Sequence, residues 1–326
     1  MPGGGRNSSN THLPFIVTYR VRAPSMSINA EFLYMHRHFR YISVRYRQKI
    51  SLSQQIQLRE ARRMRLTIVG NRAAMPADGA ASSGYLVETS QSKILLDCGP
   101  GIAVMLSNYI HASRLDAIVI SHMHMDHCYD VLPIGKQVMH HAETPDRRIK
   151  LFVPEGARVT LDRLAELFPV KTVSRLNKAF ELAYEVIEYQ RDGIYALADC
   201  TVGLVPMVHS EPDCGVRIDS SAGSIGFTGD TGWNDNLVTL AADVDIFLAE
   251  ATLVESDQTS HGHLSATEVG KAAAAGGARS VVLTHFGAPQ DEWQQARLAE
   301  AAAEFDGPVH ISRPGMRFWA SAESPQ

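Results

Sequence analysis

The 326-residue sequence has few cysteines, few aromatic residues and no long apolar run. A bilayer-spanning helix needs about 20 predominantly apolar residues in a row, and no stretch approaches that length, so a membrane-embedded protein is not expected. Cys98, Cys128, Cys200 and Cys214 show no Cys-x-x-Cys spacing, and no secretory hydrophobic segment precedes them. We therefore expect reduced thiols in a cytoplasmic protein rather than a disulfide framework.

Charge is distributed unevenly along the chain, although the net charge is only −4. Residues 1–63 hold 11 of the 31 Lys and Arg residues but two of the 35 acidic ones, so this segment carries +9 and residues 64–326 carry −13. Binding a long polyphosphate depends on neutralising many phosphates. The acidic body therefore favours a small substrate.

Residues 1–63 form a basic extension without a clear apolar period, and Met64 opens the first apolar run of the folded domain, residues 64–326. Three interpretations of the extension remain open. It is a mis-assigned translation start with Met64 as the true one, a disordered basic arm that touches RNA or a membrane surface, or an Arg-rich transit peptide. We derive no function from it.

From Met64 onwards, short apolar runs alternate with helical patterns, which indicates a layered α/β architecture. Strands are predicted at 66–69, 84–88, 93–97, 117–120, 150–153, 203–208, 215–218, 224–228, 246–249, 281–284 and 309–311. Helices are predicted at 101–108, 159–168, 266–275 and 291–304.

The strongest chemical signal is the run Ser121-His122-Met123-His124-Met125-Asp126-His127, which directly follows a predicted strand. Three imidazoles and a carboxylate within six residues combine borderline-soft nitrogen with anionic oxygen, the donors that divalent transition ions prefer. One segment can thus supply ligands to two adjacent metals. The alternative is a solvent-exposed His-rich loop that binds no metal.

Further candidate ligands end later apolar runs: His209, Asp230 within Gly229-Asp230-Thr231, and His285. Taken alone, a His or Asp after a strand is more often a cap or a polar group that is already hydrogen-bonded. Their order after the histidine cluster resembles the metallo-β-lactamase superfamily of di-metal hydrolases, over roughly residues 64–320. The resemblance implies a four-layer αββα sandwich with the metals at one rim of the two sheets.

Finer features resemble the ribonuclease Z-like phosphodiesterase branch of that superfamily. They are the segment His209-Ser210-Glu211-Pro212-Asp213-Cys214-Gly215-Val216-Arg217-Ile218, the pair Glu250-Ala251-Thr252 and His263-Leu264-Ser265, and the turn Asp97-Cys98-Gly99-Pro100-Gly101. Within the branch, the spacing and the late run Glu304-Phe305-Asp306-Gly307-Pro308-Val309-His310 are most similar to small actinobacterial-type enzymes that hydrolyse cyclic nucleotides.

The resemblance implies seven ligands for two divalent metals that share a carboxylate. One metal takes His122, His124 and His209, the other takes Asp126, His127 and His285, and Asp230 bridges them. A shared water, ionised near neutral pH, would attack phosphorus as hydroxide. Zinc is the expected ion, and manganese or iron also fits these donors.

The predicted catalytic set is His263, Asp126 and Glu250. His263 is the candidate general acid for the leaving alkoxide, and Glu250 would orient it. A helix-capping role for His263, ahead of Ser265, is the alternative. Asp97 orients the metal loop or only stabilises a turn. The remaining candidates are assigned to packing or the surface: Cys128 to packing, and His261 and the pair His140-His141 to the surface.

Three enzymatic functions follow from this set. The leading one is hydrolysis of a 3′,5′-cyclic nucleotide of the cyclic AMP type. The second is maturation of the 3′ end of tRNA, which the acidic body and the lack of a Gly-rich arm between Cys128 and Val208 disfavour. The third is a lactonase or thioesterase, against which the Glu250 and His263 motifs argue. A homodimer is a further expectation. A non-catalytic binding module would require a damaged ligand set, and all seven positions are present.

Overall fold

The computed structural model describes residues 16–23, 26–33, 63–141, 147–257 and 259–320, and the chain divides into two units, Met1–Glu60 and Ala61–Gln326. In the first unit, β1 (Ile16–Ala23) pairs antiparallel with β2 (Met26–Leu33). No strands are predicted there from the sequence, and the three interpretations of residues 1–63 stay predictions. Among the described residues, none of the helices has the length and apolar character that a bilayer span requires.

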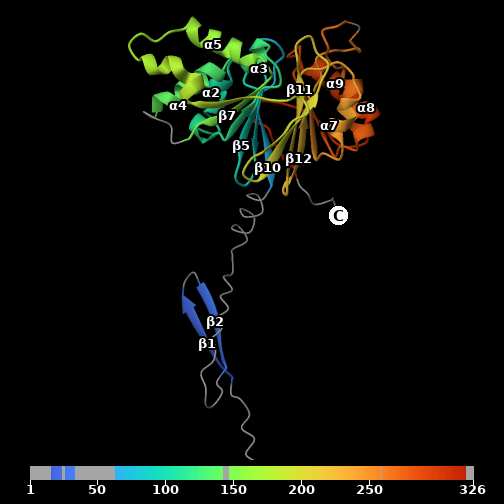
Figure 1. Cartoon of the computed structure of the whole chain (residues 1–326). Helices are drawn as coiled ribbons and strands as arrows, with labels where there is room; N and C mark the ends of the chain where they lie inside the picture. Colours follow the sequence, from blue (N-terminus) through green and yellow to red (C-terminus); the bar gives the residue numbers. More distant parts are fainter. Residues whose placement is uncertain (1–15, 24–25, 34–62, 142–146, 258, 321–326) are drawn as a thin grey trace, which may run out of the picture. The chain divides into compact units, whose positions relative to one another are not determined.

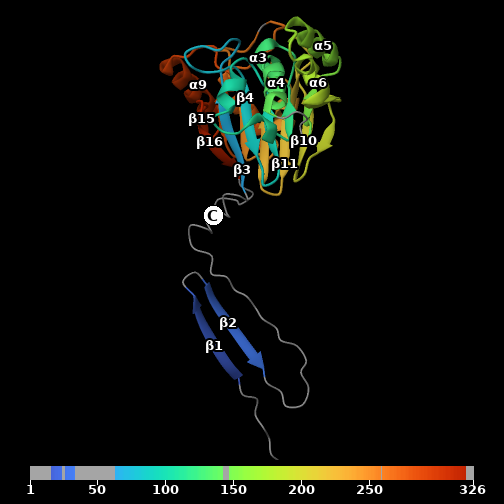
Figure 2. The same ribbon diagram turned by 90° about the vertical axis from the view of Figure 1, so that its left-hand side faces the viewer.

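Two seven-stranded sheets form the frame of the second unit within the described residues (Figure 1, Figure 2). The first has the strand order β16-β3-β4-β5-β6-β7-β8 and the second β15-β14-β13-β12-β11-β10-β9. The first sheet contains β3 (Met64–Gly70), β4 (Gly84–Glu88), β5 (Lys93–Leu96), β6 (Ala117–Val119), β7 (Ile149–Val153), β8 (Tyr184–Glu188) and β16 (Arg317–Ala320). The second contains β9 (Ile194–Ala196), β10 (Cys200–Pro206), β11 (Cys214–Ser220), β12 (Gly223–Phe227), β13 (Ile246–Glu250), β14 (Val281–Thr284) and β15 (Val309–Ile311).

Helices cover the outer face of each sheet (Figure 1). Those on the first sheet are α2 (Ile102–Leu106), α4 (Val131–His141), α5 (Ala157–Leu167) and α6 (Ala179–Leu182). Those on the second are α7 (Asn236–Ala241), α8 (Ala266–Gly276) and α9 (Asp291–Glu304). The short elements α3 (Met125–Cys128), η1 (Ala112–Arg114) and η2 (Ser174–Lys178) lie in connecting segments.

The apolar core is divided into three layers by the alternation of side chains along the strands. On β4, Val87 enters the cluster between the two sheets, whereas Leu86 enters the cluster beneath α2, α4, α5 and α6. On β13, Leu248 faces the other sheet and Phe247 packs beneath α7, α8 and α9. The layers therefore follow the order helix, sheet, sheet, helix, which confirms the predicted αββα sandwich.

The predicted ligands share one edge of the sandwich because of strand direction. Strands β5, β6 and β7 are mutually parallel, as are β12, β13 and β14. The cluster from His122 to His127 follows β6, Asp230 follows β12, and His285 directly follows β14. His209 follows β10, which runs antiparallel to β11 and thus in the same direction as β12. In open α/β sheets, ligands bind at such carboxyl ends.

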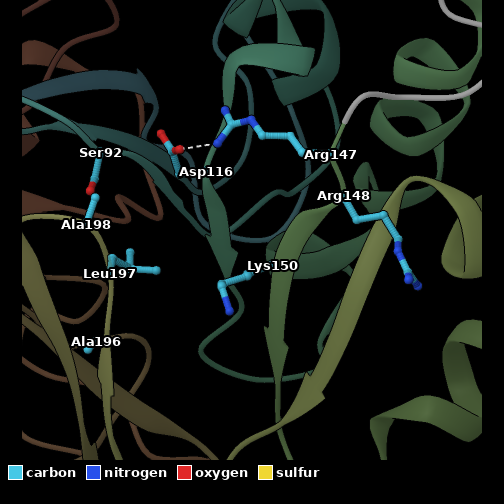
Figure 3. Close-up of a pocket in the computed structure, with 8 residues that line it drawn as sticks. All are labelled: Ser92, Asp116, Arg147, Arg148, Lys150, Ala196, Leu197 and Ala198. Atoms are coloured by element: carbon cyan, nitrogen blue, oxygen red, sulfur yellow. Dashed lines mark hydrogen bonds and ion pairs between the residues drawn. The ribbon is translucent and has the colours of Figure 1, made fainter.

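A cleft of about 340 Å³ lies at the opposite, amino end of β5–β7 (Figure 3). Ser92 and Asp116, which line it, immediately precede β5 and β6, and Lys150, which also lines it, is the second residue of β7. Figure 3 shows the side chain of Arg147 turned towards Asp116, with which it forms an ion pair, and the side chain of Arg148 turned away. This cleft contains none of the predicted site residues.

Candidate metal centre

All seven predicted ligands converge in two adjacent groups. Candidate ligand atoms of His122, His124 and His209 lie within 4.8 Å of one another, and the same holds for Asp126, His127, Asp230 and His285. The division between the groups is the one expected for two metals. The helix α3, which carries Asp126 and His127, lies at one end of the two sheets (Figure 1).

In the first group, hydrogen bonds on the outer side of the rings fix where the inward nitrogens point. The Nδ1–H of His209 donates to the carbonyl of Gly262 at 2.8 Å, and Nδ1 of His122 lies 2.8 Å from Oδ2 of Asp213. A neutral imidazole has one N–H, so Nε2 of both rings presents a lone pair. These Nε2 atoms lie 3.0 and 3.1 Å from Nδ1 of His124.

These three ring nitrogens cannot all be hydrogen-bonded to one another, because the Nε2 atoms of His122 and His209 carry no proton. Tetrahedral zinc with Zn–N bonds of about 2.0–2.1 Å places its nitrogen ligands roughly 3.3 Å apart, close to the observed spacing. Burial, followed by the charge of His127, lowers the pKa of His122 to about 3, and burial also lowers the pKa of His124 and His209. The first group is therefore neutral and suited to a cation.

In the second group, Asp230 faces both sets of histidines. Its Oδ2 lies 3.3 Å from Nε2 of His127 and 4.0 Å from Nε2 of His122, and its Oδ1 lies 3.4 Å from Nε2 of His285. Oδ2 of Asp126 lies 3.3 Å from Nε2 of His285. A carboxylate that faces both groups could help to hold an ion at each of them.

Two buried atoms of this group have no hydrogen-bond partner among the described residues: Nε2 of His127 and Oδ1 of Asp230. Leaving a buried polar atom unsatisfied costs about 1–3 kcal/mol, so two such atoms side by side need an explanation. The pKa of Asp230 is held well below its usual range because the opposing charges of His127 and His285 outweigh burial. A divalent ion would satisfy both atoms, and the donor set fits one.

Asp97 holds the metal-binding loop in place, which supports the orienting role considered for it. Oδ2 of Asp97 accepts from Nδ1 of His127 at 2.6 Å, and Oδ1 accepts from the backbone N–H of Ser121 at 2.8 Å. Asp97 and His285 both adopt left-handed backbone angles, φ 55° and φ 56°. Such conformations cost roughly 1–3 kcal/mol and persist where the surroundings require them.

Glu250 and His263 form a pair beside the second group. Nδ1 of His263 lies 2.9 Å from Oε1 of the buried Glu250, which also accepts from the backbone N–H of Thr231 at 2.7 Å. Burial alone would lower the pKa of His263, but Glu250 and then Asp230 outweigh it and raise the pKa to about 9. The helix-capping alternative is wrong, because Ser265 itself caps α8 in a capping box with Glu268.

Thr252 links this pair to His285. Its hydroxyl donates to Oε2 of Glu250 and lies 2.8 Å from Nδ1 of His285. With its proton committed to Glu250, the hydroxyl oxygen accepts from the imidazole, which leaves Nε2 of His285 facing Asp126 and Asp230. The carboxylate of Glu250 therefore orients two histidines at once.

Two residues at the centre are not predicted from the sequence as functional. Asp213 is fully buried against His122, and His261, predicted as a surface residue, has its ring centroid 4.8 Å from that of His263. His261 is exposed, as predicted, but it borders the site. Asp213 lies within the quoted His209–Ile218 motif, so its position there was the available signal. Cys128 is buried in the core, as predicted.

Asp213 provides the first testable prediction. Its carboxylate orients His122, and loss of such a partner typically weakens metal affinity about 10-fold to 100-fold. We expect Asp213→Asn to lower the chelator concentration that strips half of the bound metal by a similar factor. Glu211→Gln, an exposed position in the same loop, is the matched control. Equal metal retention in both variants would contradict the orienting role.

Comparison with known proteins places the chain in a family. The profile of the Beta-lactamase superfamily domain matches residues 92–286, more than half of the chain, and this span contains all seven predicted ligands. The chain belongs to this family. It is a metallo-hydrolase of the β-lactamase superfamily, and the pattern read from the sequence is confirmed at that level.

Individual relatives agree. The "Probable metallo-hydrolase YhfI" of Bacillus subtilis is 27% identical over 255 residues, covering 77% of this chain and 98% of the relative. The crystal structure of YhfI matches with a TM-score of 0.68 at 24% identity, covering 79% and 99%. A ribonuclease Z of Myxococcus xanthus is 26% identical, covering 77% and 96%. Human tRNase Z, short form, matches with a TM-score of 0.61 at 22% identity, covering 78% and 98%.

Proposed function

We propose that this metallo-hydrolase is a di-metal phosphodiesterase that opens a 3′,5′-cyclic nucleotide of the cyclic AMP type. The observation that carries the proposal is the pair of ligand groups on either side of Asp230, with the Glu250–His263 pair beside them. An ordered carboxylate–imidazole pair next to two metal sites supplies a proton donor for an alkoxide leaving group. A thioesterase, whose leaving group is a more stable thiolate, has less need for one.

The metals of this proposal would be held by the residues that the sequence pattern predicts. The three histidines of the first group would hold one ion, Asp126, His127 and His285 would hold the other, and Asp230 would be shared between them. When bound, two such metal ions supply an activated water and neutralise charge on the phosphoryl oxygens. Zinc is the proposed ion because it binds nitrogen and carboxylate donors, and because the ring nitrogens of the first group are spaced much as in a tetrahedral zinc site.

His263 is the proposed general acid, positioned by Glu250. Because its Nδ1 is held by the carboxylate, its Nε2 is free to face the substrate. Glu250 raises the pKa of His263 and so favours the protonated ring, from which the proton on Nε2 can pass to the departing oxygen. Asp126 contacts His285 and accepts a hydrogen bond from the backbone N–H of Ala74 at 2.8 Å. It thereby holds the loop that contains Ala74 next to the centre.

A small substrate is supported over tRNA by charge and by the course of the chain. Residues 64–326 carry −13, which repels an extended polyanion. The interval between α3 and His209, apart from 142–146, consists of elements that belong to the sandwich, from α4 to β10. In addition, Trp233 follows Asp230 by three residues and is 44% exposed. An exposed indole this close in sequence to a proposed ligand could offer a stacking surface for a nucleobase.

A substrate panel tests the proposal. The full chain, loaded with zinc, is assayed in parallel on bis(p-nitrophenyl) phosphate, cyclic AMP, cyclic GMP, a precursor tRNA, a lactone and a thioester, with Asp230→Ala prepared identically to measure contaminating activity. We expect turnover of the small phosphodiesters. Cleavage of the tRNA alone would establish the second function, ribonuclease Z-like maturation, and cleavage of the carbonyl esters alone would establish the third.

We further propose a cytoplasmic location and a homodimer. The location is supported by the four cysteines, all of which are free and buried, as expected for a reducing compartment. The homodimer rests only on the resemblance and is checked by the mass of the protein in solution.

A further inference from the structure

The wall of the centre beside His263 contains an imidazole that neither ligand group includes. The ring of His261 lies 4.8 Å from that of His263 and 5.2 Å from that of His209, and it stacks on His124 at 6.2 Å with an interplanar angle of 18°. The residue is exposed, and no hydrogen bond from its side chain to another described residue is found. It thus presents ring nitrogens to solvent at the mouth of the centre.

The backbone that carries His261 is fixed against the end of β10. The carbonyl of His261 accepts from the N–H of Ser210 at 3.0 Å, and the next carbonyl, that of Gly262, holds His209. Asp257 accepts from the N–H groups of Gly262 and His263 at 2.7 and 3.2 Å. Gly262 has φ +85°, and a Cβ there would lie 2.5 Å from the carbonyl oxygen of Val208. His261 is therefore held in place although its side chain is exposed.

A role as a metal ligand does not fit this geometry. The ring centroid of His261 lies 6.2 Å from that of His124 and 5.2 Å from that of His209. Neither ligand group contains it. A purely structural role does not fit either, because the side chain of His261 is exposed and the hydrogen bonds that hold this segment are made by backbone groups and by the side chains of Asp257 and Thr259.

We propose that His261 is a substrate-binding residue that donates a hydrogen bond from its ring to a non-bridging oxygen of the scissile phosphoryl group. The inference rests on the proposed phosphodiesterase function. His263 and His261 then contact the same phosphate at two oxygens: His263 meets the leaving oxygen, and His261 meets a non-bridging oxygen on the side of His124 and His209. Two imidazoles 4.8 Å apart suit adjacent oxygens of one tetrahedral phosphate.

The test compares His261→Ala, His261→Gln and the control Ser260→Ala, an exposed neighbour, in the zinc-loaded full chain. A hydrogen bond to a charged group is worth a factor of about 10 to 100. We expect His261→Ala to weaken the binding of inorganic phosphate, measured by calorimetry, and to lower kcat/KM for bis(p-nitrophenyl) phosphate by about that factor. His261→Gln, which keeps an N–H donor, should recover part of the loss. Ser260→Ala should match the wild type.

Metal readouts separate this role from the others. We expect the metal content and the chelator concentration for half-removal to be unchanged in all three variants. Weaker metal retention in His261→Ala would show a ligand role and overturn the proposal, as would phosphate binding and kcat/KM equal to those of the wild type. If the wild type cleaves no phosphodiester but His261→Ala still weakens phosphate binding, the proposed function fails and the anion-binding role of His261 survives.

Discussion

Replacement of Asp230 by alanine is expected to abolish turnover and to lower the metal content from about two ions per chain to one or fewer. The reason is geometric, since the carboxylate of Asp230 faces the histidines of both groups, at 3.3 and 4.0 Å through Oδ2 and 3.4 Å through Oδ1. Without it, three imidazoles at the first site, and two imidazoles with the carboxylate of Asp126 at the second, would have to hold two cations at close range with less anionic charge to offset their repulsion.

Metal analysis and turnover of bis(p-nitrophenyl) phosphate, measured on the same preparation, check this expectation. Asp230→Asn preserves the shape of the side chain and separates loss of charge from loss of packing. Asp235→Asn removes an exposed carboxylate five residues later and should behave as the wild type. Full activity with two bound metals in Asp230→Ala would exclude a shared carboxylate at this position.

The second large effect is expected for His263→Ala, which should keep both metals yet slow catalysis by roughly 10²–10⁴-fold. His263 donates to Glu250 and is not one of the seven proposed ligands, so its removal should leave both proposed metal sites complete. The loss should be larger for cyclic AMP, whose alkoxide leaving group needs a proton, than for bis(p-nitrophenyl) phosphate, whose phenolate needs little help. An equal loss on both substrates would argue against proton donation.

The dependence of kcat on pH provides a further test of His263 as a general acid. A general acid works in its protonated form, so kcat for cyclic AMP should fall as pH rises through the pKa of His263. Glu250 and Asp230 raise that pKa to about 9 without metals, and bound cations offset Asp230, so the descending limb should lie at or below about pH 9. Glu250→Gln removes the largest raising charge and should move the limb to lower pH. A limb that persists in His263→Ala would belong to another group.

Much of the fold could be predicted from the sequence because apolar runs mark buried strands directly. Strands β4, β14 and β15 have the predicted bounds, and so does α9. Helix α4 was not predicted, because Pro133 and Gly135 disfavour helix interiors. The helix nevertheless tolerates both residues. Pro133 lies in the first turn, where a backbone N–H would have no partner within the helix. Gly135 is needed for packing, because a Cβ there would lie 2.6 Å from the ring of Tyr184.

The site divides along similar lines. The seven candidate ligands could be found because their residue types are unusual and each stands at the end of an apolar run. Asp213 and His261 could not, because their roles depend on proximity in space: Asp213 reaches a histidine in the loop after β6, and His261 is brought to the mouth by the bond between Gly262 and His209. Nothing in the residue types alone distinguishes a buried orienting carboxylate from an exposed one.

The most direct test of the two-metal centre is anomalous diffraction from crystals of the zinc-loaded chain. We expect two peaks, one bonded to His122, His124 and His209 and the other to Asp126, His127 and His285, with an oxygen of Asp230 in contact with each. Zinc–nitrogen distances should be about 2.0–2.1 Å. A single peak, or peaks bonded to residues outside this set, would contradict the central claim.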